Sequence, residues 1–308
     1  MNGSRLVIVA AASFLLGAAA PGAGQAGEVP AGVILVKGAW SSAAGSLSPL
    51  PEDGMVSQNR YDNAYFGVSY TFGADWAQHY ESPPPSDGGY YVLAQIEPRD
   101  PALHARLGHF LIAAQDLFFT TTAARTATQF IDTYRSRLGD DYRVERAGKV
   151  KLANHEFARL DYLSPASGLH WRVLATEIRC HVLEFVFTGS DGRSLDRQVA
   201  SLETLMLRTG NIPVCIRDFA NDDTVLEREN PVFTEPRFNQ VPVRIVIDQE
   251  GKVKQIHFLS AFPEQAKAVT DALSQWRFKP YLIDGQPVEV ETGVVFGRAS
   301  RSGFSPAH

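Results

Sequence analysis

The strongest constraint on the fold lies near the end of the chain, where two strand patterns flank a tight turn. Residues 241–247 (VPVRIVI) alternate in the way that a half-buried strand requires. Residues 248–251 (DQEG) form a turn that ends on glycine. The returning segment 252–260 (KVKQIHFLS) departs from a strict period of two, which indicates a β-bulge. These segments predict an antiparallel hairpin.

A helix pattern and a third strand pattern follow the hairpin. Pro263 occupies the first helical position, which proline favours, and apolar residues then recur at helical spacing up to Trp276. Residues 276–281 (WRFKPY) end the helix because Pro280 has no amide hydrogen to donate. An Asp-Gly turn precedes an alternating strand at residues 288–296 (VEVETGVVF). The whole segment therefore predicts a ββαβ unit.

This unit resembles the TonB C-terminal domain over residues 241–298. The resemblance depends on D-x-x-G in the first hairpin, W-R-F-K-P-Y at the helix end and D-G-Q-P-V before the last strand. It implies that an extended segment of another protein, such as an outer-membrane TonB-dependent receptor, pairs with an exposed edge strand. The implied partner-binding strand comprises Val288, Val290, Thr292, Val294 and Phe296.

Two expectations follow from this resemblance. Trp276, Phe278 and Pro280 are expected to fix the helix against the sheet rather than to contact a ligand. Proline at Val290 or Val294 is expected to abolish partner capture while leaving the fold largely intact.

Other features of TonB energy transducers are missing from the sequence. No histidine precedes His79, and no long proline-rich, charge-alternating spacer occurs. Phe233-Thr234-Glu235-Pro236 stands where the family has Tyr-Pro-x-x-Ala. These departures indicate a binding module rather than an energy transducer.

The first 26 residues have the pattern of a secretory signal peptide. Arg5 precedes an apolar run at residues 6–20, and Gly24-Gln25-Ala26 is a small-x-small cleavage pattern. The run is shorter than the ~20 residues that span a bilayer comfortably. We therefore expect cleavage after Ala26 and a periplasmic protein without a stable membrane span. An inner-membrane anchor through residues 6–20 is the alternative.

The chain has two cysteines, Cys180 and Cys215. An even count in an exported protein favours one disulfide bond. Such a bond would stabilise the fold by roughly 3–4 kcal/mol in the chain-entropy model. The alternative is two unpaired thiols, one of them buried. No C-x-x-C motif occurs, so a redox site is not expected.

The length of 308 residues and the order of strand and helix patterns suggest an α+β protein of two domains. Residues 27–58, rich in Gly, Ala, Ser and Pro, are predicted to be a flexible leader in which residues 33–36 favour a short strand. Asn, Asp and Pro interrupt the periodicity at residues 210–236, which are predicted to be a linker. The remaining segments are an α+β domain at 59–209, the TonB-like domain at 237–299 and a tail at 300–308.

The 59–209 block predicts a twisted antiparallel sheet with two helices. Strand patterns occur at residues 65–72, 90–96, 110–119, 155–162, 171–178 and 182–187. Helical spacing predicts helices at 126–138, where Gly139 stops the helix, and at 195–207. Residues 82–89 (SPPPSDGG) are expected to form an exposed loop.

This block resembles the PsbP-like domains of exported bacterial proteins. The resemblance depends on the Y-x-N-x-x-F-G-V segment at residues 61–68, on a strand at H-E-F-A-R-L-D-Y and on a closing helix after paired hydrophobic strands. It implies binding or assembly rather than catalysis.

The sequence contains no motif that indicates an enzyme. His155-Glu156 lacks the second histidine of H-E-x-x-H, and neither G-x-S-x-G nor a P-loop nor a dinucleotide fingerprint occurs. Asp218 and residues 221–223 lack the alternation of an EF-hand loop. A net charge of −5 with intermixed signs gives no basic stripe for nucleic acid. We expect no enzyme, no cofactor, no metal and no nucleic-acid partner.

Two functions remain in view. The first is a periplasmic, TonB-related interaction protein that pairs strands with a partner. The alternative is a periplasmic protein that binds a small molecule or lipid through the PsbP-like domain. Trp76, Tyr80, Tyr90 and Tyr91 motivate this alternative, although core packing is the simpler account of these aromatic residues.

Overall fold

The computed structural model describes residues 40–41, 51, 54–79, 89–118, 124–208, 212–234, 240–259 and 261–297, all of which belong to one compact unit. The predicted signal peptide, the 33–36 segment, the tail and all but the last residue of the 82–89 loop lie outside them. The fold is α+β, as predicted. No helix in the described part of the chain is long and apolar enough to cross a membrane.

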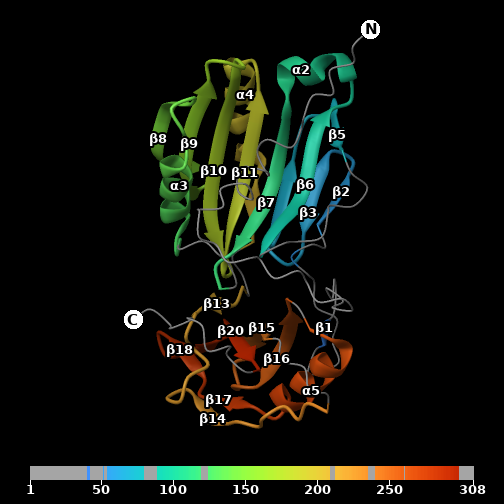
Figure 1. Cartoon of the computed structure of the whole chain (residues 1–308), viewed down its shortest axis with the longest axis vertical. Coiled ribbons are helices and arrows are strands. Elements are labelled where there is room, and N and C mark those ends of the chain that lie inside the picture. Colours follow the sequence, from blue (N-terminus) through green and yellow to red (C-terminus); the bar gives the residue numbers. More distant parts are fainter. Residues whose placement is uncertain are drawn as a thin grey trace. The chain divides into compact units, whose positions relative to one another are not determined.

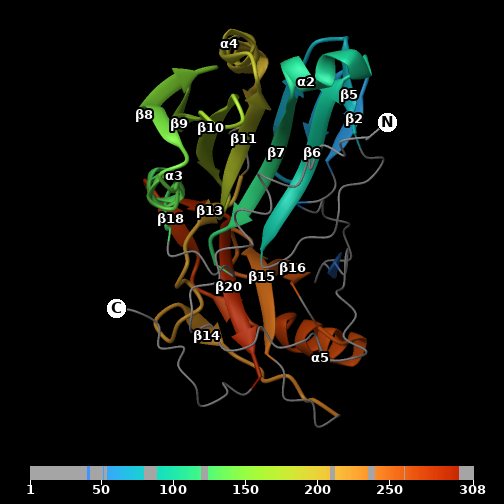
Figure 2. The same cartoon turned by 45° about the horizontal axis from the view of Figure 1, so that its top comes forward.

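A seven-stranded antiparallel sheet forms most of what we call the first module (residues 54–208). Its order is β5-β6-β7-β11-β10-β9-β8, and its long strands lie side by side in both views (Figures 1 and 2). The bounds are β5 Trp76–Gln78, β6 Tyr90–Pro98, β7 His109–Asp116, β8 Arg143–Leu152, β9 His155–Ser164, β10 Leu169–Ile178 and β11 His181–Gly189. Five of these strands correspond to predicted ones.

The edge strand β8 was not predicted. Its sequence (RVERAGKVKL) mixes charged and small residues, and most of its side chains are exposed. Such a strand has no continuous apolar face, so hydrophobic periodicity does not mark it. A charged edge strand discourages pairing with other chains.

The two faces of the large sheet bury different side chains. On one face Phe185 and Phe187 of β11 pack in a core with Leu195 of α4 (Gly192–Ser201). The amphipathic helix α3 (Ala127–Ser136) covers the other face (Figure 1). Because both faces are covered, every residue of β11 is buried.

The second predicted helix, 195–207, is too long. α4 ends at Ser201, a 3₁₀ turn η2 (Leu202–Thr204) follows, and β12 (Met206–Leu207) then pairs with the small sheet. Tertiary pairing with Val68 and Ser69 therefore overrides the helical pattern at this end. A further 3₁₀ turn and a short helix, η1 (Pro101–Leu103) and α2 (His104–Leu107), connect β6 to β7.

A four-stranded sheet in the order β12-β4-β3-β2 contains the Y-x-N-x-x-F-G-V segment. Its other bounds are β2 Met55–Ser57, β3 Arg60–Asn63 and β4 Val68–Thr71. Asn63 accepts a hydrogen bond from the amide of Phe66 (3.0 Å) and donates one to the hydroxyl of Tyr61 (3.0 Å). Gly67 completes the turn at φ +63°. The single strand predicted at 65–72 is therefore wrong at its start, where the chain turns.

The predicted ββαβ unit forms the second module (residues 212–297), and the strand β1 joins its sheet. The five-stranded sheet has the order β1-β16-β15-β20-β13, and α5 packs on one of its faces (Figure 2). The bounds are β1 Trp40–Ser41, β13 Val214–Cys215, β15 Val241–Ile247, β16 Val253–Phe258, α5 Pro263–Leu273 and β20 Val290–Phe296. A register shift opposite Val246 and Ile247 is the predicted bulge.

Four short strands complete this module: β14 Val225–Glu227, β17 Arg277–Phe278, β18 Tyr281–Ile283 and β19 Gln286–Val288. β13 and β14 lie within the predicted linker, 210–236, and pair with β20 and β17. Trp276 lies beyond the end of α5, so the predicted extension of this helix to Trp276 is wrong. The chain instead enters β17, which pairs with β14.

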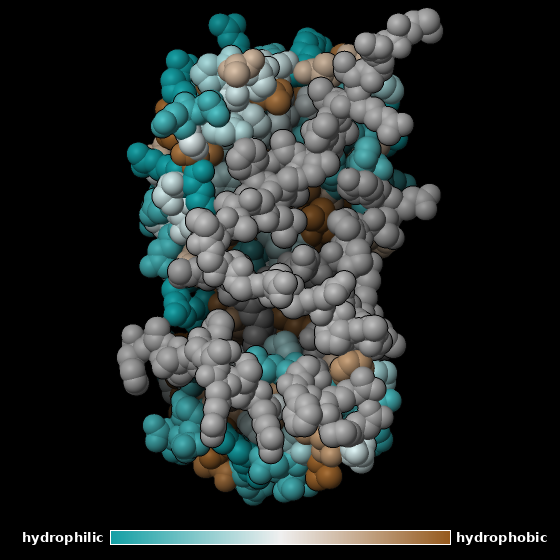
Figure 3. Space-filling view, in the orientation of Figure 1, coloured by the Kyte–Doolittle hydropathy of each residue, from teal (hydrophilic) through white to brown (hydrophobic). Residues whose placement is uncertain are grey.

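Large exposed apolar side chains are few in the described part of the chain. Figure 3 shows separate hydrophobic areas within a largely hydrophilic surface. The large apolar residues that are exposed are Met55, Val144, Met206, Leu226, Val232, Leu282, Ile283 and Val295. Val295 is the only one of these that belongs to the strand predicted to bind a partner.

Candidate functional site: the edge of β20 and the charges beside it

The strand β20 is paired along its whole length on one side and only at its start on the other. β15 pairs with it along its whole length, from Ile247 opposite Val290 to Val241 opposite Phe296. On the other side β13 pairs in parallel with only Val290 and Glu291. The first part of the predicted edge is therefore occupied by the protein's own chain.

Two backbone hydrogen bonds show which groups of β20 face β13. The amide of Val214 donates to the carbonyl of Glu289 (2.8 Å), and the amide of Ile216 donates to that of Glu291 (3.0 Å). Since backbone groups of successive strand residues alternate sides, Gly293 and Val295 direct their N–H and C=O groups the same way. On this side, away from β15, no strand of the described residues pairs with Gly293 or Val295. This short segment is the unpaired edge.

The side chains predicted to line the partner do not face outward. Val290 and Phe296 are buried in the core beneath α5, and Val294 packs against it. Thr292 is fully buried, and its hydroxyl donates to the carbonyl of Arg217 (2.9 Å). Val288 lies in β19, half-buried and opposite Tyr281. The alternating sequence pattern correctly predicted that these residues share one face of the strand. It did not show that this face packs in the core.

The aromatic residues of W-R-F-K-P-Y lie in that core. Trp276 and Phe278 are buried with ring centroids 5.9 Å apart, and the indole N–H of Trp276 donates to the carbonyl of Glu229 (2.7 Å). Trp276 also contacts Phe296 of β20 edge-on, at 5.8 Å. Pro280 is exposed.

The opposite face of the sheet carries buried charges, which we call the ion cluster: Asp116, Arg179, Arg244 and Glu291. Glu291 of β20 accepts hydrogen bonds from the Tyr65 hydroxyl (2.7 Å) and from the guanidiniums of Arg179 (2.8 Å) and Arg244 (3.0 Å). Arg244 also pairs with Asp116. Burial alone would raise the pKa of Glu291, but the two guanidiniums and the Tyr65 hydroxyl hold it below its usual value.

The cluster corrects the expectation of a half-buried strand at 241–247. Arg244 on β15 is buried as completely as the apolar residues beside it, because Asp116 of β7 and Glu291 cover it. Two buried histidines lie nearby. Burial, and then the charge of Arg244, lower the pKa of His257 to about 3 and lower that of His181 well below its usual value. Both rings are therefore neutral at physiological pH.

The predicted disulfide bond between Cys180 and Cys215 is present, with the two Cα atoms 5.2 Å apart. It joins the turn between β10 and β11 to β13. Thus the strand that occupies the start of the β20 edge is covalently attached to the first module.

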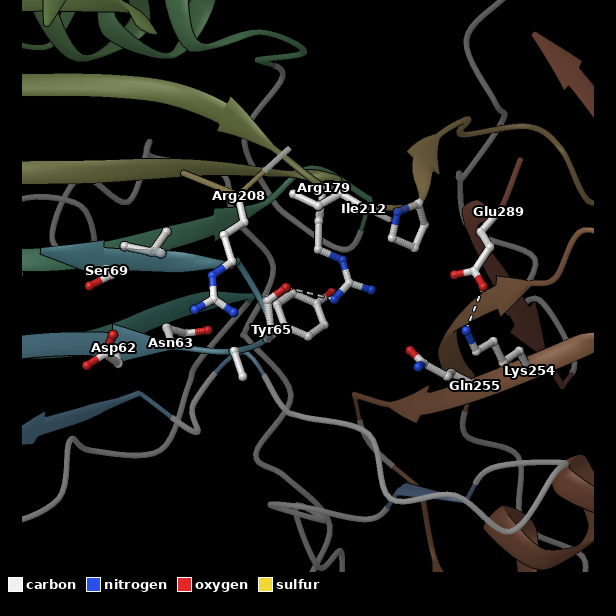
Figure 4. Close-up of a pocket in the computed structure, with 14 residues that line it drawn as sticks. Asp62, Asn63, Tyr65, Ser69, Arg179, Arg208, Ile212, Lys254, Gln255 and Glu289 are labelled. Atoms are coloured by element: carbon white, nitrogen blue, oxygen red, sulfur yellow. Dashed lines mark hydrogen bonds and ion pairs between the residues drawn. The ribbon is translucent and has the colours of Figure 1, made fainter. Parts of the chain in front are cut away.

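A cavity of about 410 Å³ lies beside Tyr65. Figure 4 shows the side chains that line it. The turn between β3 and β4 lines it, together with Arg179, Arg208, Lys254 and Glu289. No arrangement of at least three His, Cys, Asp or Glu residues fit to hold a metal ion occurs in the described part of the chain.

Three of the four aromatic residues that motivated the ligand-binding alternative are described, and core packing involves two of them. Trp76 and Tyr91 are buried in the core beneath α4, and Tyr90 is half-buried. Tyr80 lies outside the described residues. Core packing accounts for the first two.

The second module is thus a ββαβ sheet with a helix on one face and a partly open strand edge. It is a TonB C-terminal domain: residues 239–297 match the family model described as Gram-negative bacterial TonB protein C-terminal. The resemblance seen in the three motifs is thereby confirmed, and it relates this protein to the TonB proteins.

Solved structures are similar to other parts of the chain. One is the solution structure of cyanobacterial PsbP (CyanoP) from Synechocystis sp. PCC 6803, at 16% identity and a TM-score of 0.36, with 53% of this chain and 99% of that chain covered. Another is a crystal structure from Bacteroides thetaiotaomicron VPI-5482, at 17% identity and a TM-score of 0.29, with 48% and 50% covered. No curated protein matches.

Proposed function

We propose that this protein is a non-enzymatic, periplasmic, TonB-related envelope protein that binds an extended segment of another protein at the edge of β20. The observation that best supports this is the backbone of Gly293 and Val295, whose hydrogen-bonding groups face away from β15. An unpaired strand edge is normally an aggregation hazard, so an edge that stays available is consistent with use. The proposed partner is an outer-membrane TonB-dependent receptor.

In this proposal the partner strand pairs with β20 on the same side as β13, next to the residues that β13 already occupies. Main-chain hydrogen bonds to Gly293 and Val295 supply affinity, and contact with the side chain of Val295, 49% exposed, supplies selectivity. Arg179 and Arg244 form ion pairs with Glu291 on the same strand and thereby help to hold the edge in place before binding. A preorganised edge loses less conformational entropy when the partner binds.

The position of a disruptive proline follows from the backbone geometry. The amides of Val290 and Val294 face β15, so proline at either position would remove a bond within the sheet. We therefore expect these two variants to destabilise the sheet, contrary to the expectation from the sequence. Val295 is the suitable position, because its amide faces outward and its side chain is exposed.

The test begins with a photo-crosslinking residue at position 295 in cells, to identify the captured protein. Binding of that protein is then compared for the wild type, Val295→Pro and Val295→Ala. We expect Val295→Pro to lose binding with an unchanged free energy of unfolding, and Val295→Ala, which keeps the amide, to retain most of it. Equal binding by Val295→Pro and the wild type would rule out strand addition at this edge.

A further inference from the structure

The cavity beside Tyr65, which we call the Arg208 cavity, has the size of a small-molecule site. Its volume of about 410 Å³ falls within the range typical of ligand pockets. Side chains of both modules line it: Ser69, Arg179 and Arg208 on one side, and Lys254, Gln255 and Glu289 on the other. Figure 4 shows the Arg208 side chain extending towards Asn63 and Tyr65.

The charges that line the cavity do not balance. Arg179 is paired with Glu291 (2.8 Å), and Lys254 with Glu289 (2.5 Å). Arg208 has no carboxylate partner among the residues described. Asp62, the other acidic residue of the lining, is paired instead with Arg60 (2.8 Å). One positive charge in the cavity is thus left without a counter-ion from the described chain.

Local structure fixes the position of this arginine. The amide of Arg208 donates to the carbonyl of Gly67 (2.9 Å), directly after β12 pairs with β4. A Cβ on Gly67 would lie 3.3 Å from that of Arg208, a tight contact, and the φ of +63° also favours glycine at this turn. The turn that brings Asn63 and Tyr65 to the cavity therefore also places the base of the Arg208 side chain.

An unsatisfied hydroxyl lies in the same lining. Ser69 of β4 is only 5% exposed, and its hydroxyl has no hydrogen-bond partner in the described part of the chain. Buried polar groups are nearly always hydrogen-bonded, because leaving a buried donor unpaired costs free energy. The oxygen is enclosed by the protein, and Figure 4 draws it pointing away from Arg208, so this hydroxyl is not available to a ligand in the cavity.

We propose that the Arg208 cavity binds a small molecule that carries a carboxylate or phosphate group. The planar guanidinium of Arg208 can donate two parallel hydrogen bonds to either oxyanion. Lys254 and Gln255 approach from the second module. This site requires no free strand edge, so it is independent of the proposed partner binding.

Calorimetric titration of the full-length exported protein with inorganic phosphate, with succinate and with ethanolamine tests the proposal. We expect phosphate or succinate to bind and ethanolamine not to bind, with affinity that falls as salt increases. Which anion binds more tightly identifies the preferred group. Failure of both anions to bind, or preferential binding of ethanolamine, would overturn the proposal.

Variants locate the binding. Arg208→Gln should weaken the affinity about tenfold or more, as expected for loss of a charged hydrogen-bonding group. Ser69→Ala should leave the affinity unchanged, because the enclosed Ser69 hydroxyl does not reach the cavity, and it should not lower the melting temperature. The control is Arg146→Gln, an exposed arginine of β8. If Arg208→Gln binds the anion as tightly as this control, the site is elsewhere and the assignment is wrong.

Discussion

The amide of Phe278 donates a hydrogen bond of 2.8 Å to the carbonyl oxygen of Gly251. This bond joins the glycine of the D-x-x-G turn to the phenylalanine of W-R-F-K-P-Y. Gly251 adopts φ +81°, and a Cβ at this position would overlap the carbonyl oxygen of Phe278. The two motifs behind the family resemblance are therefore one structural unit, in which a turn without a side chain allows β17 to pass close by.

This relationship predicts a large effect of Gly251→Ala. The variant suffers both the strain of a left-handed residue and a backbone overlap, so we expect the free energy of unfolding to fall by roughly 2–4 kcal/mol. Gly285→Ala is a matched control: its φ is +77°, but a Cβ there meets nothing within 4 Å. Strain alone should cost about 1 kcal/mol. Urea denaturation of both variants measures the difference, and equal losses would refute the overlap.

The ion cluster predicts strong destabilisation when one member is removed. Arg244→Met leaves Asp116 and Glu291 buried without this guanidinium, so we expect a loss of about 3–5 kcal/mol in the free energy of unfolding. Adding Glu291→Gln should cost less than the sum of the two single changes, because these residues are in contact. A double-mutant cycle by chemical denaturation measures this coupling. Additive losses would show that the pair contributes nothing specific.

Glu184 is a buried carboxyl group outside the ion cluster. It lies in the middle of β11, opposite Ala113 and Ala175, with no exposed surface. Neither carboxylate oxygen has a hydrogen-bond partner among the residues described. Burial raises its pKa from 4.5 to about 8. The group is therefore protonated in the folded protein at neutral pH.

This shift predicts a pH-dependent stability. Between pH 4.5 and about 8 the folded protein keeps a proton that the unfolded chain loses, so rising pH destabilises the fold. As the pH rises, the free energy of unfolding of Glu184→Gln should therefore increase relative to that of the wild type by roughly 1.4 kcal/mol per pH unit. Denaturation at several pH values from 5.5 to 7.5 measures this difference. The buried histidines are present in both proteins, so their contribution cancels.

The control for this experiment is Glu250→Gln, at an exposed position in the β15–β16 turn. Its stability should follow that of the wild type at every pH. A wild-type curve parallel to that of Glu184→Gln would show that Glu184 is ionised in the folded protein.

The sequence predicted the elements that have an apolar face. β9, β10, β11, β15 and α5 follow clear periods and were placed within a few residues. Elements whose stability comes from elsewhere were missed or misplaced: β8 is exposed and charged, and β12 forms only because β4 offers it a partner. Periodicity reports which face of an element is apolar, and it does not report pairing.

The candidate site was predictable only in part. The strand at 288–296 was identified, but its polar positions were ambiguous because a charged residue on a strand normally faces solvent. Glu291 is instead buried against Arg179 and Arg244, which are distant in the sequence. Only the tertiary fold selects such partners. β13 was likewise not predicted, because it lies within the predicted linker. The expected disulfide bond of Cys215 was the one signal that this segment is attached to the first module.

The disulfide bond predicts a local effect on the occupied part of the β20 edge. Cys180 and Cys215 are 35 residues apart, so replacing both by serine should lower the free energy of unfolding by about 3–4 kcal/mol. β13 pairs with only two residues of β20, so without this attachment we expect it to open more often than the rest of the sheet. Hydrogen exchange should then accelerate at the amide of Ile216 in the double variant and in the reduced wild type. Protection at Ile216 that equals that of the oxidised protein would show that β-pairing alone holds this strand in place.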